Sequence, residues 1–184
     1  MTDGNLSRGD SCPVRDSDPI HAIRFWLLIV IAGLVLSGVT AFPLETELRW
    51  LLLILRSTPF RSFAEFTHLL PWIDRVYGGL SLTNEHFPFL GYGTDWLAFA
   101  HLVIAVAFIG PYRDPVRNEW VITFGLIACA GVIPLALIAG HIRGIPIAWR
   151  LLDCSFGVLG GIPLLLCRRH IHTLEQFGIR KKDV

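Results

Sequence analysis

The sequence predicts an all-α, polytopic membrane protein with four transmembrane helices and an extramembrane or interfacial helical segment between the first two. Of its 184 residues, 53% are hydrophobic and 17% are charged, and the mean hydropathy is +0.55. An average soluble domain is about 25% charged. Four apolar runs are long enough, or nearly so, to cross a hydrocarbon layer of about 30 Å. A tryptophan, which favours the membrane interface, stands near the leading end of each run: Trp26, Trp96, Trp120 and Trp149.

The predicted spans cover residues 23–42, 94–110, 120–140 and 146–167. The second is the shortest, because its apolar run begins only at Trp96 and needs Thr94 and Asp95 to lie in the headgroup region. The third contains Pro134, which a membrane helix tolerates where its neighbours satisfy the freed carbonyl. We interpret the first run as an anchor rather than a cleaved signal peptide, since a long acidic leader precedes it.

The segments outside the spans differ in character. Residues 1–22 are rich in Asp, Ser, Gly and Pro, which predicts a disordered tail. In the long loop 43–93, the stretch Glu45–Leu55 begins with acids and continues with apolar residues, which predicts an interfacial helix. A second amphipathic helix is predicted over Arg61–Tyr77, where apolar residues recur at spacings of three and four. Turns are then predicted at Gly78, Gly79, Asn84, Pro88, Gly91 and Gly93.

The distribution of cations predicts that both termini face the cytoplasm. With four spans, the N-terminal tail, the loop 111–119 and the basic tail 168–184 share one side, and the loops 43–93 and 141–145 share the other. The side with the termini holds ten of the 16 Lys and Arg residues, which favours a cytoplasmic position. We expect Arg168 and its basic neighbours to contact anionic headgroups.

Two ionisable residues, His101 and Asp153, fall within the predicted spans, where such groups are costly and often functional. Each lies about 10 Å along its helix from the end opposite the cytoplasm. We therefore predict a polar cluster in the outer half of the bundle. Its further candidate members are Arg150, Asp95, His141 and Arg143.

Small residues on the second and fourth spans predict a close helix contact. On the fourth span they are Gly157, Gly160 and Gly161, and on the second span they are Ala98 and Ala105. We expect these two stripes to pack on one another. Such packing would bring His101 within reach of Asp153.

Three interpretations of the predicted cluster are open. His101 and Asp153 could relay protons or bind a small cation, since a carboxylate favours the protonated imidazole. In the structural alternative, Arg150 and Asp153 neutralise one another and His101 makes one interhelical hydrogen bond. In the third, haem b lies between His101 and His141. We predict no catalytic residue, no metal site and no resident cofactor.

Three stretches carry a resemblance: Gly91–His101, Gly110–Arg117 and Arg143–Gly157. They resemble an uncharacterised family of bacterial four-span integral membrane proteins, over roughly Phe25–Arg168. The resemblance implies a four-span fold in a bacterial inner membrane. It implies no activity.

Together these patterns favour a non-enzymatic role as a small subunit or assembly partner of a larger membrane complex, with the lipid bilayer and other membrane chains as partners. The formal net charge of +1 provides no basic field for nucleic acid. The loop 43–93 is the expected recognition surface. The alternatives are a small transporter or proton-handling protein that uses His101 and Asp153, and a haem-binding redox protein.

Overall fold

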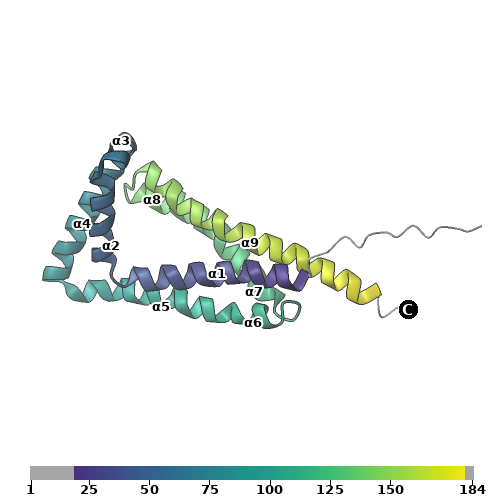
Figure 1. Ribbon diagram of the computed structural model, residues 1–184. Coiled ribbons are helices and arrows are strands. Elements are labelled where there is room, and N and C mark those ends of the chain that lie inside the picture. The colour runs from purple at the N-terminus through teal and green to yellow at the C-terminus, as the bar shows by residue number, and fades with distance from the viewer. Residues whose placement is uncertain (1–18, 181–184) are drawn as a thin grey trace, which may run out of the picture.

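A computed structural model describes residues 19–180 and confirms the all-α class (Figure 1). The expectation of a disordered tail falls largely on residues 1–18, which lie outside the described part, as do residues 181–184. Four helical segments are long and apolar enough to cross a membrane: Pro19–Ala41, Pro88–Arg113, Glu119–Ile142 and Ile147–Glu175. The protein is therefore a multi-pass membrane protein with four candidate spans.

The first arm of the structure is formed by α1 (Pro19–Ala41) and α5 (Tyr92–Ala107), which pack side by side, and by the short α6 (Ile109–Arg113). At Gly38 the backbones approach so closely that an added Cβ would lie 2.9 Å from the Ala98 carbonyl oxygen. Only glycine fits there without a shift of the helices. Within the described residues α1 reaches back to Pro19, four residues before the predicted span.

The second arm is formed by α7 (Glu119–Pro134) and α9 (Ile147–Arg180). An added Cβ at Gly157 of α9 would lie 2.5 Å from the Cys129 carbonyl oxygen of α7. Helix α9 has 34 residues and continues well beyond the predicted end of the span at residue 167. It carries the basic segment out of the membrane as ordered helix.

Between α7 and α9 the chain passes through a wide turn. The π-helix η2 (Leu135–Ala139) follows Pro134 directly, and the short α8 (Gly140–Ile142) ends the span. Proline has no N–H to donate and crowds the turn before it, and the wider helix begins directly after this residue. The predicted third span is therefore helical throughout, and its helix type changes from α to π near its C-terminal end.

The two arms meet at one end, the converging end, and separate towards the other, the diverging end (Figure 1). Helix α1 joins them, since it packs against both α5 and α9. One apolar core fills the converging end, and its buried members come from both arms: Ile23, Leu27, Phe108, Val121, Ile122, Leu164, Cys167 and Ile171.

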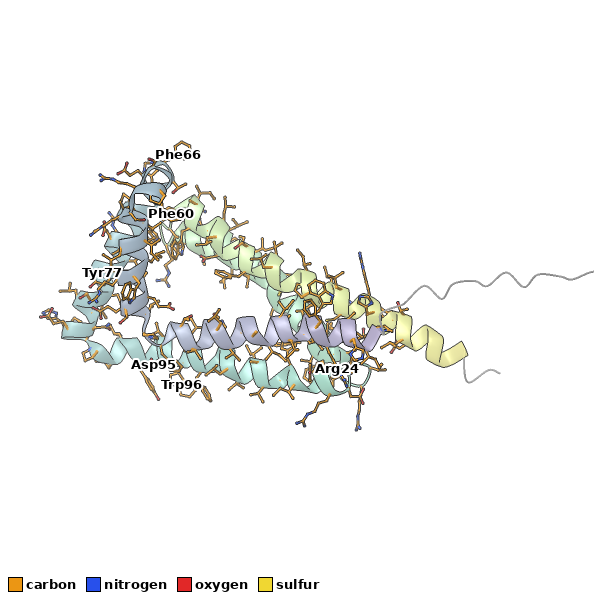
Figure 2. All side chains as sticks on the ribbon, viewed as in Figure 1. Arg24, Phe60, Phe66, Tyr77, Asp95 and Trp96 are labelled. Atoms are coloured by element: carbon orange, nitrogen blue, oxygen red, sulfur yellow. The ribbon has the colours of Figure 1, made fainter. Side chains whose placement is uncertain are left out.

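A helical hairpin, here the outer hairpin, lies across the diverging end (Figures 1 and 2). It comprises α2 (Leu44–Arg56), α3 (Thr58–Phe66) and α4 (Leu69–His86), and η1 (Pro88–Gly91) links it to α5. Its core contains Leu48, Leu52 and Ile73, and Trp149 at the start of α9 packs against that core. The outer hairpin thereby connects the two arms where they no longer touch.

The outer hairpin corrects two expectations. The helix predicted over Arg61–Tyr77 is broken between α3 and α4, where His68 has a left-handed φ of 55°. Pro71 explains the break, because its ring would clash with the carbonyl of Thr67 in a continuous helix.

The turns expected at Gly78, Gly79 and Asn84 are likewise wrong, since α4 runs through them to His86. Each of the two adjacent glycines weakens the helix by only about 1 kcal/mol. Packing of Val76, Tyr77 and Leu80 against the hairpin core compensates for that loss.

The contact at Gly157 can be tested by Gly157→Ala. The added methyl group must push α7 and α9 apart, and we expect the free energy of unfolding to fall by about 1–3 kcal/mol. The measurement is reversible unfolding in mixed micelles. Gly131→Ala on α7 is the matched control, because an added Cβ there meets nothing within 4 Å. Equal effects of the two substitutions would contradict the assigned contact.

Candidate functional site

Asp153 lies on the face of α9 that turns towards the first arm. Ile171 follows it by about five helical turns, so the two side chains project from the same face. Ile171 is fully buried in the core of the converging end, where α1 covers this face. Asp153 is only half-buried. It belongs to the first two turns of α9, and this end of the helix has separated from α1 (Figure 1).

His101 occupies the corresponding face of α5. Phe108 follows it by about two turns and is buried against α7, where an added Cβ at Gly125 would lie 2.7 Å from the Phe108 ring. His101 therefore turns towards the region between the arms. Its Nδ1 donates a hydrogen bond to the Leu97 carbonyl (2.7 Å), which leaves Nε2 as an acceptor.

The expected contact between the small-residue stripes is not formed. Ala98 packs on Gly38 of α1, whereas Gly157, Gly160 and Gly161 pack on Cys129 of α7. Ala105 is buried within the first arm. The sequence shows where helices can approach closely, but the same small residues suit any neighbour, and each stripe has a different one.

His101 and Asp153 are accordingly not joined. Within residues 19–180 no hydrogen bond or ion pair links them, and Asp153 has no polar partner in that range. In the same range no three His, Cys, Asp or Glu side chains gather as a metal site. We use the name inter-arm site for the two separate faces that carry these residues, that of α5 with His101 and that of α9 with Asp153.

Arg150 does not neutralise Asp153. Its Nη1 donates to the Leu137 carbonyl of the π-helix (3.3 Å), and its methylene groups cover Gly140, where an added Cβ would lie 2.7 Å from Cδ. The Nε atom is buried without a hydrogen-bond partner. Arg150 therefore caps the widened turn, and the carboxylate of Asp153 keeps its acceptor capacity.

The remaining candidates lie elsewhere. His141 and Arg143 are exposed at the end of α8. His141 is thus on the second arm and His101 on the first (Figure 1). Asp95 lies at the start of α5, next to a pocket at the base of the outer hairpin (Figure 2).

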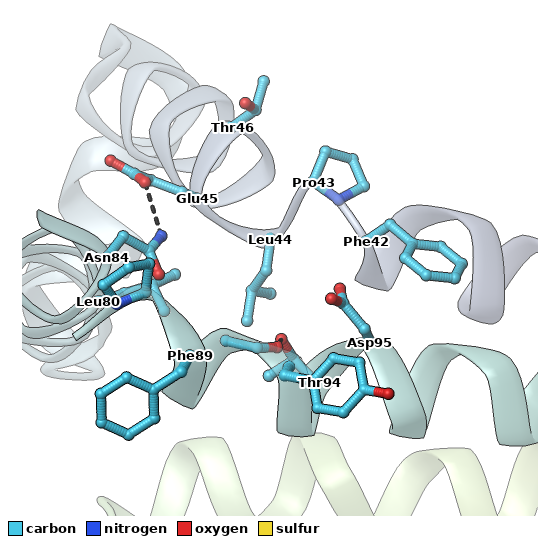
Figure 3. Close-up of a pocket in the computed structure, with 13 residues that line it drawn as sticks. Phe42, Pro43, Leu44, Glu45, Thr46, Leu80, Asn84, Phe89, Thr94 and Asp95 are labelled. Carbon is cyan, nitrogen blue, oxygen red and sulfur yellow. Dashed lines mark hydrogen bonds between the residues drawn. The ribbon is translucent and has the colours of Figure 1, made fainter.

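This elbow pocket lies where α1 turns into α2 and where η1 turns into α5 (Figure 3). Its volume is about 650 Å³. The lining residues are Phe42, Pro43, Leu44, Glu45, Thr46, Leu80, Asn84, Pro88, Phe89, Gly91, Tyr92, Thr94 and Asp95. Sequence reasoning identified Asp95 but not Glu45 or Asn84. Acidic residues at the start of two helices were the available signal.

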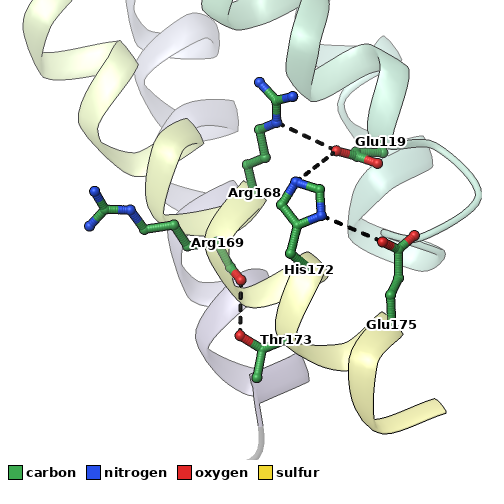
Figure 4. A network of polar contacts seen from close by, with 6 residues as sticks. All are labelled: Glu119, Arg168, Arg169, His172, Thr173 and Glu175. Carbon is green, nitrogen blue, oxygen red and sulfur yellow. Dashed lines mark hydrogen bonds and ion pairs between the residues drawn. The ribbon is translucent and has the colours of Figure 1, made fainter. Parts of the chain in front are cut away.

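At the converging end, Glu119 joins the two helices of the second arm (Figure 4). Its Oε1 lies 3.5 Å from Arg168 Nε and 3.8 Å from His172 Nε2, and His172 Nδ1 lies 3.5 Å from Glu175. Arg168, which was expected to meet headgroups, thus has a partner in the protein. An acid at the first residue of α7 also suits the helix dipole.

Comparisons with protein families, curated proteins and solved structures give no match. No family is identified for the chain.

The absence of an intramolecular partner for Asp153 can be tested by Asp153→Leu. If its carboxylate has no partner in the chain, leucine should raise the free energy of unfolding of the purified protein in bicelles by about 1–3 kcal/mol, because an apolar group replaces a charge at membrane depth. Asp74→Leu serves as control and should lower stability by up to about 1 kcal/mol, since Asp74 pairs with Arg56 (2.6 Å) at the surface. A loss of stability in Asp153→Leu would show an intramolecular role.

Proposed function

We propose that the protein is a non-enzymatic small subunit or assembly partner of a larger membrane complex, and that a transmembrane helix of another chain occupies the inter-arm site. The observation that carries this proposal is Asp153. It is a half-buried carboxylate within a candidate span, and no residue in 19–180 pairs with it.

A carboxylate at this depth is unfavourable in lipid and is normally paired or faces water. A partner helix with a hydrogen-bond donor would satisfy Asp153, and a second donor could reach the free Nε2 of His101. Of the residues in each apolar window, only 17% to 22% are buried. The spans therefore leave most of their surface for lipid or for other helices.

Small residues in the spans suit such a partner. Gly33 on α1 and Gly131 on α7 have nothing within 4 Å of an added Cβ. Without side chains, these positions allow another backbone to come close, and close approach is what drives helix association in lipid. In the same proposal, the outer hairpin is the surface that extramembrane parts of the complex recognise.

We also propose an orientation, with the converging end and both termini in the cytoplasm of a bacterial cell and the outer hairpin on the opposite side of the inner membrane. Arg24 lies near the converging end (Figure 2), Arg113 ends α6, and Arg168 contacts Glu119 at the start of α7, as the positive-inside rule would require.

The partner is tested by photocrosslinking in native membranes. A benzophenone amino acid at Ser37 should give one discrete crosslinked chain, since Ser37 follows the core residue Ile23 by about four turns on the face towards α9. The same probe at Leu36, which is 65% exposed, should react with lipid. Asp153→Asn should reduce the Ser37 product at least about fivefold, the effect of losing roughly 1 kcal/mol.

Two outcomes would overturn the proposal. One is equal crosslinking from Ser37 and Leu36. The other is proton flux through liposomes of the purified protein that Asp153→Asn abolishes while the crosslink persists, which would favour the proton-handling alternative.

The orientation is tested by labelling single cysteines in a chain whose native cysteines are replaced by alanine. Ser62→Cys in the outer hairpin should react with a membrane-impermeant maleimide in intact cells. Arg117→Cys in the loop between α6 and α7 should react only after permeabilisation. The reverse pattern would invert the topology.

A further inference from the structure

The elbow pocket at the base of the outer hairpin contains two carboxylates, those of Glu45 and Asp95. The geometry points to a binding site for an aliphatic ammonium group, held by the carboxylates of Glu45 and Asp95. This site is separate from the inter-arm site and does not depend on the proposed complex.

The charge of the pocket lining favours a cation. The lining contains two carboxylates and no Lys, Arg or His. Within residues 19–180, neither carboxylate has an ion pair; the polar partner of Glu45 is the amide of Asn84 (2.8 Å). A phosphate or carboxylate ligand would be repelled, and a cation would complete the site.

The size of the elbow pocket and the residues of its wall indicate which kind of cation it would bind. Ca²⁺ and Mg²⁺ take six or more oxygen ligands, water included, close around the ion. The pocket has a volume of about 650 Å³, in the range of small-molecule sites. Phe42, Leu44 and Leu80 provide an apolar wall. Such a wall can pack against the methylene chain that carries an ammonium group, whereas it provides no ligand atom for a metal ion.

Aromatic rings near the pocket also favour an ammonium ligand. Phe89 and Tyr92 lie at the rim of the pocket, where they are 71% and 62% exposed, and ring faces attract ammonium groups. Figure 3 shows the Asp95 carboxylate between Leu44 and Phe42, so charge and apolar wall are adjacent. The preceding residue helps to fix the elbow, because Thr94 Oγ1 donates to the Gly91 carbonyl (2.6 Å).

The pocket lies at the end of α1 and the start of α5, where two candidate spans leave the membrane. At that level, the ammonium can come from the amino headgroup of a phospholipid or from a soluble alkylamine. Both present the same chemistry, and the experiment distinguishes them.

The test uses the full-length protein in dodecyl maltoside, a detergent without charge. Two probes are titrated separately, 1,4-diaminobutane and lysophosphatidylethanolamine, and the unfolding temperature and the tryptophan fluorescence are recorded. We expect saturable stabilisation by at least one probe. Neither 1,4-butanediol nor sodium chloride of equal ionic strength should reproduce it.

Variants assign the effect to the pocket. Asp95→Asn and Glu45→Gln should each raise the apparent Kd by about tenfold, as expected when a charge-assisted contact is lost. Glu85→Gln is the control, since Glu85 is an exposed acid of α4 outside the pocket lining and its loss should leave binding unchanged.

The responses to the two probes distinguish the possible sources of the ammonium group. Response to the lipid alone assigns a headgroup site, and response to the diamine assigns a site for soluble amines. No saturable response to either probe, or an equal loss of binding in Glu85→Gln, overturns the proposal.

Discussion

The arrangement of the spans depends on one apolar core that lies at one end only. Helix α1 is its centre, because it packs against α5 on one side and α9 on the other. Cys167 illustrates how close this contact is, with its Sγ 3.6 Å from the Ile23 carbonyl and the side chain fully buried. Away from this core the arms separate, and contacts of Trp149 with the outer hairpin hold the diverging end together.

A bundle closed at one end gives its polar groups unequal surroundings. At the converging end Glu119 has Arg168 and His172 as partners. Towards the diverging end Asp153 has no partner within residues 19–180, and α1 no longer covers the face of α9 that carries it. The same chain thus satisfies its charges where it packs on itself and leaves them available where it does not.

The spans were predictable because hydrophobicity is a local property of the chain, and the apolar runs fix their number and order. Pro71 could also have predicted the break before α4, since proline restricts the turn before it. The helical state of Gly78 and Gly79 could not be predicted, because it depends on packing against α2. Nor could the elbow pocket, since Glu45 and Asn84 meet only after the outer hairpin has folded.

Helix α9 is continuous over 34 residues, or roughly 51 Å at 1.5 Å per residue. One end carries Trp149 in the hairpin core, and the other carries Arg168 and His172 beside Glu119. Although Pro163 lies inside it, the helix is not interrupted. A single helix therefore joins the contacts at the diverging end to the ion pairs at the converging end.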